Sequence, residues 1–159
     1  MLRRLPRSIL TVTAIMAAAT ASAVPVIPGA AGFGMETPAG RGGAVYKVTN
    51  LNASGAGSLK ACVDATDPRI CVFEVSGTIK LSAGLTIRNN NITIAGQTPP
   101  SPGLLIRGAP IRIQASEVLI QHLRVRVGDD AAGPDPSNRD ALKVEGTTSK
   151  PVRNVVVDH

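Results

Sequence analysis

The clearest hydrophobic pattern in the chain lies in residues 117–127, which are rich in Val, Ile and Leu. From Leu119 onward apolar and polar residues alternate, which predicts a β-strand with one buried face. Two other stretches, residues 91–97 and 154–159, resemble it. Each of the three begins with a polar residue that is followed by residues dominated by Ile, Leu and Val. This self-similarity indicates a structural repeat.

Aligning Ile92, Val118 and Val155 gives repeat offsets of 26 and 37 residues, and the longer repeat contains the loop-like stretch 128–138. A unit of this length cannot bury its own apolar side, so it becomes stable only when neighbouring units stack. Two sets of residues are expected to stack in this register: Gly96, His122 and His159, and Ala95, Gln121 and Asp158.

Further short strand-like runs lie between the repeated stretches, at residues 85–88, 104–107, 111–114 and 141–144. Several short strands per repeat, with no room for crossover helices, favour an all-β fold of the parallel β-helix type. An antiparallel sandwich of the same strands is the alternative, because its turns have a similar spacing.

The two ends of the predicted solenoid differ. Residues 59–65 are predicted to form a short helix that Ser58 caps and that covers the N-terminal end of the core. At the other end the strand pattern continues to His159 without a capping element. We therefore expect residues 24–159 to be the N-terminal part of a longer β-helix domain, truncated at its C-terminus.

Residues 1–23 have the pattern of an export signal. Arg3, Arg4 and Arg7 precede a mostly apolar run, which ends at the small-residue sequence Ala21-Ser22-Ala23. Because the apolar run is too short to span a bilayer, a cleaved signal is expected rather than a membrane anchor. The mature protein is expected to begin near Val24 and to be secreted.

Removal of this signal lowers the charge of the chain. The formal net charge is +6, from 17 basic and 11 acidic residues, and three of the basic ones lie in the signal, which leaves 14 minus 11, or +3. Aromatic residues make up 2% of the chain, so stacking platforms for nucleic-acid bases are scarce. Neither a nucleic-acid nor a membrane partner is expected, and the chain is expected to be a monomer.

The two cysteines, Cys62 and Cys71, are expected to form a disulfide because the chain is exported. A loop of this size stabilises a fold by roughly 2 to 3 kcal/mol in the entropic model. A metal or redox pair would need C-x-x-C spacing or partner ligands.

The candidate metal ligands lie in and just after the loop-like stretch. Its carboxylates, with one amide among them, are hard oxygen donors of the kind that Ca²⁺ prefers: Asp129, Asp130, Asp135, Asn138 and Asp140. Asp140 differs from the others because it stands at the start of a predicted strand. The remaining aspartates also suit a solvated, turn-forming loop.

Arg124 and Arg126 are predicted to project from one polar face, because they alternate with apolar residues. Their forked donors could bind the carboxylates of acidic sugars or pair with the nearby aspartates, and the pattern favours neither. His122 and His159 are interpreted as stacking partners rather than zinc ligands, since no third soft ligand accompanies them.

Several ordered motifs together resemble the pectate lyase family of secreted polysaccharide lyases. They are F-G (33–34), T-P-A-G-R-G-G (37–43), V-Y-K-V-T-N-L-N (45–52), S-G-A-G-S-L (54–59), V-F-E-V-S-G-T-I (72–79), I-T-I-A-G-Q (92–97) and N-V-V-V-D-H (154–159). The resemblance implies a right-handed parallel β-helix that binds Ca²⁺ and cleaves acidic pectic polysaccharide, such as polygalacturonate, by β-elimination.

The resemblance also assigns roles to single residues. Asp140 matches a calcium ligand of the family, and Asn138 stands where a second acidic ligand often lies. Asp158 and His159 match the D-H motif, which is interpreted as structural support for the site. The resemblance places the catalytic base beyond His159, so the 159-residue chain alone is expected to be inactive. A non-catalytic β-helix that binds carbohydrate or mediates adhesion is the alternative.

Overall fold

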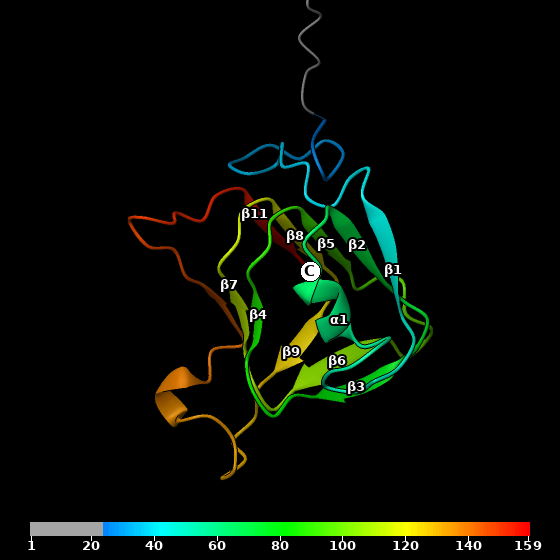
Figure 1. Ribbon diagram of the computed structural model, residues 1–159, viewed down its shortest axis with the longest axis vertical. Coiled ribbons are helices and arrows are strands. Elements are labelled where there is room, and N and C mark those ends of the chain that lie inside the picture. The colour runs from blue at the N-terminus through cyan, green and yellow to red at the C-terminus, as the bar shows by residue number, and fades with distance from the viewer. Residues whose placement is uncertain (1–23) are drawn as a thin grey trace, which may run out of the picture.

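The computed structural model describes residues 24–159 as a parallel β-helix (Figure 1). The predicted export signal, residues 1–23, lies outside the described residues. Eleven strands form three sheets, in the orders β1-β2-β5-β8-β11, β3-β6-β9 and β4-β7-β10. Every strand pair within residues 24–159 is parallel, so the prediction of a β-helix is confirmed and the antiparallel sandwich is wrong.

The strands are short, as the sequence predicts. Their bounds are β1 Ala44–Val48, β2 Arg69–Phe73, β3 Gly77–Lys80, β4 Leu85–Ile87, β5 Ile92–Ala95, β6 Leu104–Arg107, β7 Ile111–Ile113, β8 Val118–Gln121, β9 Arg124–Arg126, β10 Leu142–Val144 and β11 Val155–Asp158. The chain visits the three sheets in turn, so that β2, β3 and β4 make one coil and β5, β6 and β7 make the next. Strands β8, β9 and β10 form a third coil, and β11 begins a fourth.

The predicted register is confirmed. Val118 pairs with Ile92 on one side and with Val155 on the other. The polar residue before each of these strands, Asn91, Glu117 or Asn154, has a positive φ of 61°, 58° or 54°. Left-handed backbone suits asparagine better than β-branched residues. The repeated polar residue therefore marks the corner at which each coil enters the five-stranded sheet.

One prediction about the central stretch is wrong. Residues 117–127 form two strands, β8 and β9, which belong to different sheets. The chain turns between them at His122, whose φ is 52°. Because of this turn, His122 does not continue the alternation that places Arg124 and Arg126 on one face.

The core consists of inward side chains that stack from coil to coil. Ile87 lies beside Ile113, and Ile94 beside Ile120, and all four are at most 2% exposed. In β10 and β11 the equivalent inward residues are open to solvent, with Val144 51% and Val157 53% exposed. This end of the apolar core is uncovered in the described chain.

A helix covers the opposite end of the core, as predicted. Helix α1 spans Leu59–Asp64 and lies across the opening of the coils in Figure 1. Ser58 caps it by accepting a hydrogen bond from the Ala61 amide, and the buried face carries Leu59, Cys62 and Val63. The predicted disulfide joins Cys62 of the helix to Cys71 of β2, with a Cα–Cα distance of 6.0 Å.

The segment before β1 packs on the outside of the five-stranded sheet. Ala39 is buried there with Leu119 and Val156, which face outward from β8 and β11. Thr37 donates a 2.6 Å hydrogen bond to Glu117, which ties the segment to a coil corner. In the part of the chain that the structure describes, no helix has the length and apolar character needed to cross a membrane.

Candidate functional site

The outer face of the β4-β7-β10 sheet carries a row of polar side chains. Thr86, Arg112 and Lys143 stand in one row across it, because these residues occupy matching positions in the three strands. Their neighbours along each strand point into the core, which fixes their outward direction. Two segments, residues 128–141 and 145–154, project from the molecule at either end of the β10 strand (Figure 1). The sheet face thus lies between two protruding loops.

A second polar row runs along the edge where these strands end. Arg88, Gln114 and Glu145 each follow a strand of the sheet, and Lys150 comes from the projecting segment after β10. These residues, with Gly146 and Thr147, line a hollow of about 400 Å³. Lys150 donates to the Arg88 carbonyl at 3.4 Å, which draws the loop toward the first strand of the sheet.

Glu145 is the carboxylate at the centre of this basic surface. Its oxygens lie 2.9 Å from Gln114 Nε2, 3.4 Å from Lys143 Nζ and 3.8 Å from Arg112 Nη1. The hydrogen bond from Gln114, helped by Lys143 and Arg112, lowers the pKa of the Glu145 carboxyl although burial acts in the opposite direction. One carboxylate among Arg88, Arg112, Lys143 and Lys150 leaves the face with an excess of positive charge.

The two predicted calcium ligands lie at the other end of β10. Asp140 is exposed two residues before the strand begins, and Asn138 is half-buried at the end of the 3-10 helix Pro136–Asn138. Within residues 24–159 the four aspartates of this region do not form a group of three that could share one ion. The structure places Asp140 just before the last strand of the sheet that carries the basic face, and it does not gather the other aspartates around Asp140.

The aspartates of the loop have local partners. Asp135 caps the 3-10 helix, and its hydrogen bonds with Ser137 lower the pKa of its carboxyl. Asp130 accepts from the Ala132 amide at 3.0 Å, and its carboxylate lies 3.9 Å from Lys80. These contacts agree with the turn-forming interpretation of both residues.

The predicted substrate-binding arginines lie on another sheet. Arg124 and Arg126 are both exposed on β9, which belongs to the β3-β6-β9 sheet. Arg124 donates to the carbonyls of Pro102 and Leu104 at 2.5 and 3.4 Å. Its guanidinium is thus held by the backbone of the preceding coil, away from the β4-β7-β10 face.

The predicted stacking of the two histidines is confirmed. The rings of His122 and His159 have centroids 4.6 Å apart and an interplanar angle of 24°. Asp158 contacts His159 Nδ1 at 2.8 Å and accepts from Gln121 Nε2 at 3.3 Å. These residues lie at the end of the five-stranded sheet, at a different corner of the coil from Asp140.

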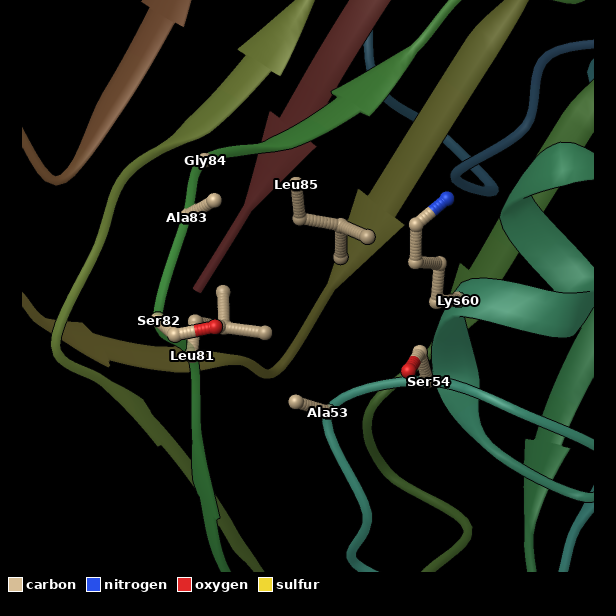
Figure 2. Close-up of a pocket in the computed structure, with 8 residues that line it drawn as sticks. All are labelled: Ala53, Ser54, Lys60, Leu81, Ser82, Ala83, Gly84 and Leu85. Carbon is tan, nitrogen blue, oxygen red and sulfur yellow. The ribbon is translucent and has the colours of Figure 1, made fainter.

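A smaller hollow of about 170 Å³ lies beside α1 (Figure 2). Lys60 of the helix and Ser54 line one side, and the segment from Leu81 to Leu85 lines the other. Lys60 is the titratable residue of this lining, and it is paired with Asp64 one helical turn away. The hollow offers less polar chemistry than the face described above.

Sequence reasoning missed the residues of this face: Arg88, Arg112, Lys143 and Lys150. A signal for two of them was present, because Ile111-Arg112-Ile113 and Leu142-Lys143-Val144 both place a basic residue between two apolar ones. In a stacked repeat such residues lie side by side on the outer surface.

Comparison with known proteins identifies similar sequences. The chain is 41% identical over 124 residues to "Probable pectate lyase C" of Aspergillus fumigatus, covering 77% of the chain and 28% of the relative. It is 39% identical over 140 residues to the protein of the same name from Emericella nidulans, covering 87% of the chain and 30% of the relative. The chain thus spans less than a third of the length of these curated relatives.

The fold is also similar to a solved structure. The 1.7 Å crystal structure of Jun a 1, the major allergen from cedar pollen, matches with a TM-score of 0.60 and 22% identity, over 82% of this chain and 41% of the allergen. No protein-family model matches the chain. With identities of about 40% over most of the described residues, on a parallel β-helix with the predicted register, this chain is homologous to a part of the proteins named pectate lyase C.

Proposed function

We propose that this chain is part of a secreted, calcium-dependent lyase that binds acidic pectic polysaccharide, such as polygalacturonate, and cleaves it by β-elimination. The observation that carries the proposal is the row of Arg112 and Lys143 on a sheet whose last strand begins beside Asp140. A uronate polymer carries one carboxylate per sugar, so it complements a face with excess positive charge. The domain proposed for this role is residues 24–159.

The side chains near β10 offer oxygen atoms, which is the type of ligand that the proposed calcium ion takes. Asp140 offers a carboxylate and Asn138 an amide oxygen, and hard oxygen ligands are those that Ca²⁺ takes. Asp140 and Asn138 would hold the ion, whose charge would make the C5 proton of a bound uronate more acidic. Two side chains supply a part of the six to eight oxygens that calcium needs, and water and substrate carboxylates are further sources.

The residues of this chain would bind and orient the polymer. Lys143 and Arg112 would contact uronate carboxylates, and Glu145 would hold both cations in place through its ion pairs. Arg124 and Arg126 would contact a chain that continues onto the neighbouring sheet. The disulfide between Cys62 and Cys71 supports secretion, because disulfides persist in oxidising compartments.

The test measures binding of the 159-residue chain to polygalacturonate with calcium or with a chelator. We expect binding that depends on calcium and that Asp140→Ala makes insensitive to calcium. Lys143→Gln should weaken binding by about two- to fivefold, the range of an exposed charge pair. Because the resemblance places the catalytic base beyond His159, we expect no unsaturated uronate product from this chain.

Lys47→Gln is the matched control, since Lys47 is an exposed lysine on β1 that pairs with Glu74. It should bind like the original chain. Binding that ignores both calcium and Asp140 would instead favour a carbohydrate-binding or adhesion module. Absence of binding under all conditions would contradict the proposal as a whole.

A further inference from the structure

The corner after β8 and β11 gathers the only two histidines of the chain. Strands β8 and β11 are paired in register, with Gln121 opposite Asp158, so the next residues, His122 and His159, lie one above the other. The His122 amide donates to the Asp158 carbonyl at 2.9 Å. Both histidines have left-handed backbone, with φ of 52° and 64°. The two side chains therefore leave the backbone in matching directions.

A carboxylate completes this cluster. One donor atom from each of His122, Asp158 and His159 lies within 4.8 Å of the other two. Asp158 is partly buried, with 22% of its side chain exposed, and the Gln121 amide bonds to one of its oxygens at 3.3 Å. The sequence suggested no third ligand for the histidines, and the structure supplies one.

We propose that His122, Asp158 and His159 form a binding site for a divalent transition metal ion of the zinc type. Two imidazole nitrogens and one carboxylate oxygen are ligands that zinc accepts, whereas calcium takes oxygen ligands. Gln121 acts on the metal through Asp158, as an outer partner that orients the carboxylate. The site is separate from Asp140 and would bind a different metal from the one proposed there.

The geometry requires a small closing movement. Ligand atoms around a tetrahedral zinc ion at about 2.0–2.1 Å lie about 3.4 Å apart. Donor pairs that are up to 4.8 Å apart must therefore approach, while Asp158 and His159 Nδ1, at 2.8 Å, must move slightly apart. His159 can move, because 69% of its side chain is exposed. On the other side of His122 the preceding coil contributes Gly96, which has no side chain to stack on the ring. The imidazoles can therefore turn toward a shared ion without displacing core residues.

The test follows the two imidazoles of the untagged chain by NMR during titration with zinc. With two histidines in the sequence, each resonance is assigned by one substitution. We expect both resonances to change together and to saturate at one zinc ion per chain, with no such change on adding calcium. Zinc that leaves both resonances unaffected, or that perturbs one alone, would overturn the proposal.

Variants provide a second measurement, by calorimetric titration with zinc. His122→Asn and His159→Asn keep a residue that accepts left-handed backbone, and each should weaken zinc binding by more than about tenfold. Asp158→Asn should do the same. Glu36→Gln, which changes an exposed carboxylate outside both proposed metal sites, is the matched control and should bind as the original chain does. Equal affinity of the control and the three ligand variants would contradict the assignment even if all of them fold.

Discussion

The side chain of Arg69 is fully buried at the start of β2. Its guanidinium donates to five backbone carbonyls, those of Cys62, Val63, Asp67, Asn89 and Asn90. Burial lowers the pKa of Arg69, although Asp67 acts in the opposite direction. Arg69 thus joins the end of α1 to the corners of two successive coils. The carbonyls of Cys62 and Val63 lie at the C-terminal end of the helix, where no following turn supplies an amide donor.

We therefore expect Arg69→Met to destabilise the fold by about 3 kcal/mol, because buried carbonyls would lose their donors. Urea unfolding measures this as a lower transition midpoint. Arg41→Met is the control, since Arg41 is exposed and donates to the Val24 carbonyl. If the two variants unfolded at the same midpoint, the bonds of Arg69 would contribute little to stability.

Among the elements, the contact of β5 with β8 depends on Gly96. A Cβ at this position would lie 2.3 Å from the Gln121 carbonyl oxygen and 2.6 Å from that of His122. Both are backbone atoms of the next coil, so neither can move without displacing β8. We expect Gly96→Ala to cost about 1 to 3 kcal/mol through this overpacking.

Thermal unfolding of two alanine variants checks the expectation. Gly84→Ala serves as the reference, because its Cβ would meet its nearest atoms at 3.5 Å, an ordinary contact. This variant should melt close to the original chain, while Gly96→Ala should melt several degrees lower. A Gly96→Ala protein with an unchanged melting temperature would show that the two coils can separate freely.

The sequence predicts the elements well for a physical reason. Each coil must turn at a left-handed corner, and Asn91, Glu117 and Asn154 mark that corner before each apolar run. The bend at His122 was not predictable, because the apolar run 118–120 passes into the alternating residues 122–127 without a Gly or Pro. The sequence also does not show to which of the three sheets a three-residue strand belongs. The positions of Arg112 and Lys143 relative to Asp140 could therefore not be predicted. The metal and substrate roles of Asp140, Asn138, Arg124 and Arg126 stay predictions.

Along the coil axis of residues 24–159, the inward side chains are less buried at the β10 and β11 end than in the middle coils. Inward residues of the middle coils, such as Ile113 and Ile120, are at most 2% exposed, whereas Val144 and Val157 of the last strands are half exposed. Strands with fewer buried contacts open at lower free energy. We expect amide hydrogen exchange to be slowest in β5 and β8 and much faster in β10 and β11.

Hydrogen exchange followed by mass spectrometry or NMR measures this gradient directly. Strand β5 is the internal reference, because it is paired on both sides and its inward residues are fully buried. Equal protection of β5 and β11 would mean that the chain unfolds as one unit, without a weaker end.

Helix α1 makes the two ends of the described coils different. It covers the core at one end, while the inward side chains of β10 and β11 are exposed at the other. A further coil of the same kind could stack only on the β10 and β11 end, because α1 fills the other opening of the coils.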